Sequence, residues 1–137
     1  MTVTAEETDR EASGGVTVLV AEDDPDLSDL VCHVLRGEGY RVEVACDGEE
    51  ALARFEECRP DLVVLDVMMP RLTGFEVLSR LRDLEEAGSS VPVLILSARA
   101  SEEDIVKGFR LGVSDYVTKP FMIGELRARV RSLLARA

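Results

Sequence analysis

Short aliphatic runs alternate five times with longer segments of helical periodicity, starting at Val16. The runs have the length of strands, and the intervening segments repeat apolar residues every three or four positions, as amphipathic helices do. Such alternation is typical of βαβ units and a parallel sheet. The run Leu62–Leu65 is apolar at every position, which indicates a central strand covered by helices on both faces. The sequence therefore predicts an α/β fold with five parallel strands and five helices.

Residue types at the element ends give approximate boundaries. Asp24 directly precedes Pro25 and is best explained as a helix N-cap, and Asp47 is a second expected N-cap. Pro60 blocks the helix that follows Asp47. The helix that spans about 101–111 is expected to present Ile105, Val106 and Phe109. The expected strands cover residues 16–21, 40–45, 62–65, 93–96 and 116–118.

The length and composition fit one domain. The chain has 137 residues, of which 46% are hydrophobic. Residues 1–15 carry almost no large apolar side chain, so they cannot offset the entropy lost on ordering. We expect a disordered tail over residues 1–15 and a single domain over residues 16–137.

The charge balance excludes several partners. Sixteen Lys and Arg residues against 27 Asp and Glu residues give a formal charge of -11, which repels nucleic acid and anionic membranes. The sequence has neither a run of about 20 apolar residues nor a secretory signal. Cys32, Cys46 and Cys58 lack metal-site or disulfide spacing and are expected to be reduced packing residues. We expect a cytoplasmic protein that binds neither DNA nor membranes directly.

Polar residues follow four of the predicted strands where each strand ends. Glu22 and Asp23 follow the first, Asp66 the third, Ser97 the fourth and Lys119 the fifth. The carboxyl ends of parallel strands share one edge of the sheet, where ligands bind. Carboxylates that converge there repel by roughly 4 kcal/mol per pair at about 4 Å, and a cation relieves this repulsion. Oxygen ligands without a nearby histidine favour Mg²⁺ over Zn²⁺.

Each of these residues also has an ordinary structural explanation. Glu22 and Asp23 can cap the next helix, Ser97 can be an N-cap, and Lys119 can be a surface charge. Asp66 follows four buried aliphatic residues and precedes three apolar ones, so a solvated surface role is harder to defend. The agreement of several strand ends favours a functional site.

Four sequence blocks resemble the signatures of bacterial two-component response-regulator receiver domains. These are A-E-D-D at 21–24, D-V-M-M-P-R-L-T-G at 66–74, L-S-A-R at 96–99 and D-Y-V-T-K-P-F at 115–121. The resemblance extends over about residues 16–136 and is closest to receivers of winged-helix transcription factors. It implies a flavodoxin-like fold: one doubly wound five-stranded parallel sheet of order 2-1-3-4-5, with two helices on one face and three on the other.

The resemblance also assigns roles at the predicted site. Asp66 would accept a phosphoryl group from a sensor histidine kinase or a small phosphodonor. Asp23, Asp66 and the backbone carbonyl of Met68 would bind Mg²⁺, and Glu22 would act through a metal-bound water. Lys119 would pair with a phosphoryl oxygen. Such a domain is not an enzyme toward other substrates, because it catalyses only its own phosphorylation and dephosphorylation.

Switching is the second implied property. Phosphorylation would draw the Ser97 hydroxyl toward the site, and Tyr116 would rotate into the vacated space. The surface formed by the fourth helix, the fifth strand and the fifth helix would then change and control a partner. The bond between Lys119 and Pro120 is expected to be cis. Met68 and Arg99 are expected to lie over Asp66 and restrict attacking water.

The expected partners are a sensor histidine kinase, a downstream effector protein or missing effector domain, and a second copy of the chain. Ile105 and Ser114 stand where dimerising receivers of this type usually have charged residues, so the dimer match is incomplete. We expect no effector domain within these 137 residues, so the chain is either a stand-alone receiver or the front end of a longer regulator, and its output is unknown. The residues proposed for a homodimer contact are Asp115, Arg129, Lys107 and Glu125.

Three alternatives remain open. An aspartyl-nucleophile phosphatase normally needs a second Asp two residues after the first, where this chain has Met68. A nucleotide-binding domain needs a glycine-rich loop after the first strand, where this chain is acidic. A degenerate receiver used as a binding scaffold would not need the intact acidic, hydroxyl and lysine set. His33 is expected to face solvent and to take no part in phosphotransfer.

Overall fold

The computed structural model describes residues 15–85 and 90–136. Residues 1–14, which form nearly all of the predicted tail, lie outside the described residues. Five parallel strands form one sheet of order β2-β1-β3-β4-β5, as the resemblance implies. The elements are β1 (Thr17–Ala21), α2 (Pro25–Gly37), β2 (Arg41–Ala45), α3 (Gly48–Cys58), β3 (Leu62–Leu65), α4 (Gly74–Leu84), β4 (Val93–Ser97), α5 (Glu102–Arg110), β5 (Asp115–Thr118) and α6 (Ile123–Arg136).

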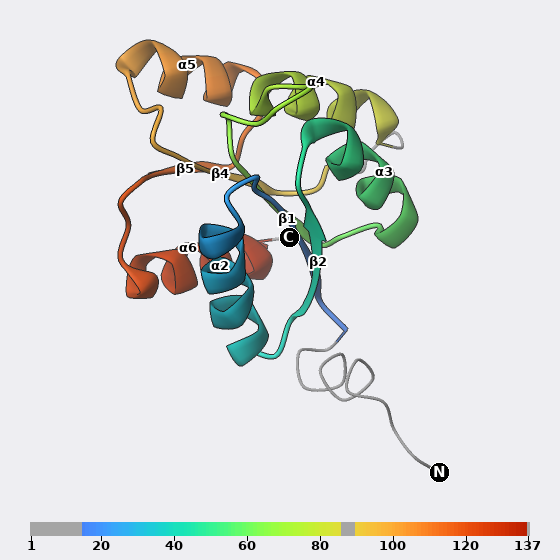
Figure 1. Ribbon diagram of the computed structural model, residues 1–137, viewed down its shortest axis with the longest axis vertical. Coiled ribbons are helices and arrows are strands. Elements are labelled where there is room, and N and C mark those ends of the chain that lie inside the picture. Colours follow the sequence, from blue (N-terminus) through green and yellow to red (C-terminus); the bar gives the residue numbers. More distant parts are fainter. Residues whose placement is uncertain (1–14, 86–89, 137) are drawn as a thin grey trace.

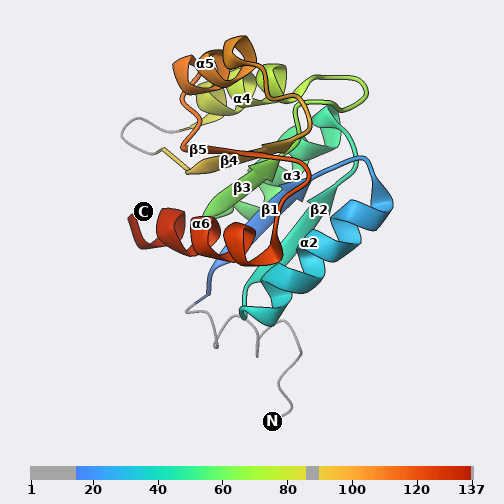
Figure 2. The same ribbon diagram turned by 90° about the vertical axis from the view of Figure 1, so that its left-hand side faces the viewer.

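The helices form a layer on each face of the sheet. Helices α2 and α6 cover one face, and α3, α4 and α5 cover the other (Figure 1, Figure 2). This is the two-and-three arrangement that the resemblance implies. Within the described parts of the chain, we find no helix of the length and apolarity that a membrane span needs.

Successive residues of the central strands enter opposite cores, because side chains alternate across a strand. In β3, Val63 and Leu65 pack in the core beneath α3 and α4, whereas Leu62 and Val64 pack in the core beneath α2 and α6. All four are buried. The uninterrupted apolar run is therefore the consequence of helices on both faces, as predicted.

Side-chain caps fix the starts of the helices. The Asp24 carboxylate accepts from the backbone N–H groups of Asp26 and Leu27 in the first turn of α2, and Asp47 accepts from Glu50 N–H at 2.8 Å in α3. Both predicted N-caps are confirmed. Thr73 forms a capping box with Glu76 at the start of α4, and Ser101 caps α5.

Helix α5 departs from the predicted pattern. Val106 and Phe109, which were expected on its buried face, are 41% and 49% exposed. The residues of α5 that are buried are Asp104 and Gly108. A Cβ on Gly108 would lie 3.3 Å from the Tyr116 ring, so the missing side chain lets this ring lie close against the helix. Close packing through glycine turns these two apolar side chains outward, so the expected stripe is wrong for Val106 and Phe109, whereas Ile105 is half-buried.

Arg82 joins three segments at the end of the sheet remote from the strand carboxyl ends. Its guanidinium donates to the carbonyl oxygens of Val91 and Gly112, at 2.8 and 2.7 Å, and to Glu85 at 2.7 Å. Glu85 in turn accepts from Val91 N–H at 2.6 Å. One side chain therefore holds the end of α4 to the segments that lead into β4 and β5.

The three cysteines are free, as predicted, but they differ in burial. Cys32 is buried and Cys58 is half-buried, so both pack in the fold. Cys46 is exposed, so its predicted role as a packing residue is wrong. It lies just beyond the end of β2, where the chain leaves the sheet.

Candidate functional site

The parallel hydrogen-bond ladder continues past the strand ends into the candidate site. Asp66 N–H donates to the carbonyl of Ala21 at 3.0 Å, and Lys119 N–H donates to the carbonyl of Ser97 at 3.0 Å. Glu22 extends β1 in the same way, donating to a carbonyl of β2 at 3.1 Å. The backbone of each residue is therefore fixed by its neighbouring strand, which places their side chains at one edge of the sheet.

Three carboxylates converge at this edge. Glu22, Asp23 and Asp66 each place one oxygen within 4.8 Å of the other two. Glu22 and Asp66 are both 5% exposed, whereas Asp23 is exposed. Buried acidic side chains at such distances repel one another unless a cation or a proton lies between them.

Lys119 provides one cation for this cluster. Its ammonium donates to Glu22 Oε1 at 2.6 Å and to Asp66 Oδ2 at 2.9 Å. The other Asp66 oxygen, Oδ1, accepts from Met68 N–H at 3.0 Å. The Lys119–Pro120 bond is cis, as the resemblance implies. Asp66 is therefore held on both oxygens, with its carboxylate facing the lysine.

The pKa values reflect this crowding. Burial, together with a hydrogen bond to Asp66, raises the pKa of Glu22 from 4.5 to about 7. Burial opposes ionisation of Asp66 as well, but hydrogen bonds from Glu22 and Lys119 outweigh it and lower the pKa of Asp66. Burial works against the charge of Lys119, yet the two acids raise its pKa. Of the two buried acids, Asp66 therefore has the stronger tendency to ionise and Glu22 the stronger tendency to bind a proton.

The donor set fits a hard divalent cation. Three carboxylates face one ammonium, which leaves an excess of negative charge, and all the available ligand atoms are oxygens. Such sites suit Mg²⁺, which keeps several waters and takes few protein ligands. Met68 is 60% exposed, and its contact with Asp66 is made by its backbone N–H. The family and this acidic cluster together are consistent with a metal site.

The two predicted switch residues meet at Arg99. Ser97 is fully buried, and its hydroxyl oxygen accepts from Arg99 N–H at 3.1 Å. The Tyr116 hydroxyl donates to the carbonyl of Arg99. Both side chains therefore contact the loop between β4 and α5, one strand away from Asp66.

The Arg99 side chain, which was predicted to lie over Asp66, has contacts on α5 and α4. Its guanidinium Nε donates to Asp104 Oδ1 at 2.8 Å, and its Cζ lies 5.9 Å from the centre of the Phe75 ring. Arg99 is thus tied to α5 and α4.

Sequence reasoning missed the role of Gly74, the first residue of α4. Its N–H donates to the carbonyl of Val67 at 2.8 Å, and a Cβ here would lie 2.3 Å from the carbonyl oxygen of Asp66. Glycine lets α4 begin in contact with the chain that carries Asp66. The glycine at the end of the block D-V-M-M-P-R-L-T-G was the available signal.

The residues predicted for a homodimer contact already have partners within the chain. Arg129 binds Asp115 at 2.8 Å and lies 3.6 Å from Glu125. The Lys107 ammonium lies 4.8 Å from the centre of the Phe75 ring. The predicted cross-subunit ion pair is therefore an intrachain pair in this structure, because β5 and α6 bring Asp115 and Arg129 together.

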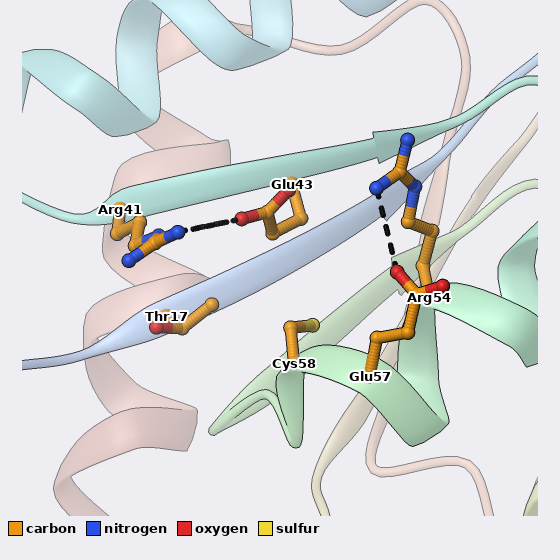
Figure 3. Close-up of a pocket in the computed structure, with 6 residues that line it drawn as sticks. All are labelled: Thr17, Arg41, Glu43, Arg54, Glu57 and Cys58. Carbon is orange, nitrogen blue, oxygen red and sulfur yellow. Dashed lines mark hydrogen bonds and ion pairs between the residues drawn. The ribbon is translucent and has the colours of Figure 1, made fainter.

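A polar pocket of about 380 Å³ lies at the opposite edge of the sheet (Figure 3). In it Arg41 pairs with Glu43 at 3.2 Å, and Arg54 pairs with Glu57 at 3.5 Å. Burial raises the pKa of the Cys58 thiol, which keeps it protonated. The charges are balanced and the pocket is remote from the strand carboxyl ends, so we assign it no chemistry.

The fold and the site define a flavodoxin-like α/β domain with an acidic cluster and a lysine at the carboxyl edge of its sheet. The family model of the response regulator receiver domain matches residues 18–131, and the chain belongs to this family. It is accordingly a phosphorylation-activated signalling switch of the two-component type.

Two solved structures and one curated relative illustrate the similarity. TrcR, a transcriptional regulatory protein of Mycobacterium tuberculosis, is 47% identical over 122 residues, covering 89% of this chain and 46% of TrcR. The receiver domain of the Francisella response regulator 1452 is 39% identical with a TM-score of 0.81, covering 89% of this chain and 98% of that one. A chain of the CheX–CheY–BeF₃–Mg²⁺ complex from Borrelia burgdorferi is 25% identical with a TM-score of 0.80, covering 86% and 88%. The chain spans about half the length of the curated relatives it matches.

Proposed function

We propose that Asp66 is the phosphoryl acceptor and that Asp23, Asp66 and the backbone carbonyl of Met68 hold Mg²⁺, with Glu22 acting through a metal-bound water. The observation that carries this proposal is the geometry around Asp66: a buried carboxylate with one oxygen 2.9 Å from the Lys119 ammonium and two further acids within reach of a shared cation. The Borrelia complex, which contains BeF₃ and Mg²⁺, supports the same ligand chemistry. The domain would span residues 16–137.

The chemistry follows from the charges. An Asp66 carboxylate oxygen attacks the phosphorus of the donor, a new O–P bond forms, and the bond from phosphorus to the leaving group breaks. Lys119 pairs with a phosphoryl oxygen and stabilises the charge that develops there. Bound Mg²⁺ would supply further neutralisation of that charge. The reaction modifies the protein itself, so we propose no enzymatic activity on other substrates.

The phosphodonor in this proposal is a sensor histidine kinase or a small acyl phosphate. A groove of about 470 Å³ runs beside Lys119 and is lined mainly by apolar side chains, including Leu27, Leu30 and Phe121. Leu30 is 41% exposed, so a protein that presents a phosphohistidine to Asp66 and docks in this groove would bury it. We also propose a cytoplasmic location, with which three free cysteines agree.

A substitution in this groove distinguishes transfer from the kinase from transfer from a small phosphodonor. Leu30→Ala should slow transfer from the kinase and leave the rate with acetyl phosphate unchanged, because only a protein donor contacts this surface. Equal effects on both donors would contradict a docking role.

The proposed output is a change on the surface of α5, β5 and α6 that favours a homodimer or an effector. Transcriptional regulation through a DNA-binding part of a longer protein is part of this proposal, since TrcR is a transcriptional regulatory protein. The receiver part itself carries excess negative charge and is not proposed to touch DNA. Sedimentation with and without beryllofluoride tests the dimer, and a monomer in both conditions would reject it.

Intact mass after incubation with acetyl phosphate tests the acceptor. With Mg²⁺, native protein should gain one phosphoryl group, and Asp66→Asn, which keeps the size of the side chain, should gain none. Chelating the metal should abolish the gain in native protein. Equal phosphorylation of the variant would reject Asp66.

A further inference from the structure

Arg99 contacts three elements of the proposed switch at once. Its backbone N–H donates to the Ser97 hydroxyl oxygen, its backbone carbonyl accepts from the Tyr116 hydroxyl, and its side chain pairs with Asp104. The loop between β4 and α5 therefore contacts both switch side chains through the backbone of one residue. Anything that fixes this backbone also fixes Ser97 and Tyr116.

The carboxylate of Asp104 supplies that restraint. It is buried, and its two oxygens are used separately: Oδ1 accepts from Arg99 Nε at 2.8 Å and Oδ2 accepts from the Ser101 hydroxyl at 2.7 Å. Asp104 N–H donates back to Ser101 Oγ at 3.1 Å, which caps α5. The loop is closed onto the first turn of α5 at two points.

Two aromatic contacts extend the restraint to neighbouring elements. The Arg99 guanidinium carbon lies 5.9 Å from the centre of the Phe75 ring on α4. The Tyr116 ring packs close to Gly108 on α5. Movement of the loop would therefore disturb α4, α5 and β5 together.

We propose that Arg99, held by Asp104, is a positioning residue that keeps Ser97 and Tyr116 in the arrangement seen here and so opposes switching. This inference rests on the proposed function, in which Ser97 moves toward a phosphoryl group on Asp66. That movement displaces Arg99, breaks its bond to Tyr116 and strains the ion pair with Asp104. Removing the ion pair raises the population of the responsive arrangement, and ligands that select this arrangement bind more tightly.

Asp104→Asn is the informative substitution, because asparagine keeps an acceptor for Ser101 but removes the charge. The matched control is Glu38→Gln, which neutralises an acid that pairs with Arg131 at 2.6 Å near the far end of α2. Arg99→Lys keeps the cation and should behave like native protein. Arg99→Ala repeats the test from the other partner, should Asp104→Asn fold poorly.

Two readouts separate positioning from general stability. The first is the midpoint of a beryllofluoride titration with saturating Mg²⁺, which should fall about threefold in Asp104→Asn, the scale expected for a partly exposed ion pair. The second is the ¹⁹F NMR spectrum of protein labelled with 3-fluorotyrosine. The chain has two tyrosines, Tyr40 and Tyr116, so the spectrum contains two resonances. Without beryllofluoride, the Tyr116 resonance of Asp104→Asn should move toward its beryllofluoride-saturated position, and the Tyr40 resonance should stay in place.

The outcomes distinguish this inference from the proposed function. A native protein that does not bind beryllofluoride would reject the proposed function itself. Binding by the native protein, with the same midpoint and Tyr116 resonance in Asp104→Asn as in Glu38→Gln, would overturn the inference about Arg99 alone. The inference about Arg99 is supported if both readouts shift in Asp104→Asn, shift in the same way in Arg99→Ala and stay at the native values in Arg99→Lys.

Discussion

Replacing Gly74 with alanine should destabilise the domain and displace the phosphoryl acceptor. A Cβ at this position would lie 2.3 Å from the carbonyl oxygen of Asp66 and 2.7 Å from the Cα of Val67. Both are backbone atoms that no side-chain rotation can move away, so α4 or the chain after β3 has to shift. Overpacking typically costs about 1–3 kcal/mol, and backbone contacts this short place the cost near 3 kcal/mol.

Thermal unfolding followed by circular dichroism measures this cost. For a domain of this size a loss of about 1 kcal/mol lowers the melting temperature by roughly 3–5 °C, so the variant should melt about 9–15 °C below native protein. Gly124→Ala is the matched control, because a Cβ at Gly124 in α6 meets nothing within 4 Å. It should be neutral or gain up to about 1 kcal/mol from helix propensity.

The same substitution should impair phosphorylation beyond its effect on stability. A shift of the Asp66 backbone lengthens the contact between its carboxylate and the Lys119 ammonium, so acetyl phosphate should label the variant more slowly even at a temperature where it is fully folded. If Gly74→Ala has the same melting temperature as Gly124→Ala and is labelled at the native rate, the close-contact reasoning is refuted.

Three further predictions follow from the site and the fold. Lys119→Met should slow labelling by acetyl phosphate by at least about 100-fold, as expected for loss of a charge-stabilising group, and calorimetry should show tighter Mg²⁺ binding because the ammonium no longer competes for the carboxylates. The folded pKa of Glu22 is about 7, above its ordinary 4.5, so the folded metal-free domain binds more protons than the unfolded chain between these values. The melting temperature of the domain in chelator should therefore fall as pH rises from about 4.5 to 7. The affinity for Mg²⁺ should rise over the same range and beyond pH 7, because Glu22 loses its proton. In the Glu22→Gln variant, neither the melting temperature nor the Mg²⁺ affinity should show this pH dependence. Arg82→Ala should reduce the free energy of unfolding by about 2 kcal/mol in denaturant titrations, because two carbonyl oxygens lose a charged donor.

Features that depend on local sequence were predictable. The alternation of strands and helices, the strand-end positions of Asp66 and Lys119, and the caps at Asp24 and Asp47 all follow from residue types over a few positions. The parallel sheet then brings the strand ends together, because its carboxyl ends share one edge.

Features that depend on packing between distant segments were not predictable. The exposure of Val106 and Phe109 follows from close packing of Gly108 against the Tyr116 ring. The spacing of apolar residues along the chain does not reveal that contact. The pairing of Arg99 with Asp104 depends on the path of a short loop. Intrachain pairing of Asp115 with Arg129 likewise depends on how α6 packs beside β5.

The location of the phosphoryl group tests the central proposal most directly. Borohydride reduces an aspartyl phosphate to homoserine, which peptide mass spectrometry locates in the chain. After treatment with acetyl phosphate and Mg²⁺, we predict homoserine at position 66 and nowhere else, and none when Mg²⁺ is withheld. Homoserine at position 23, or no homoserine at any position after full exposure to the donor, would contradict the assignment of Asp66 as the acceptor.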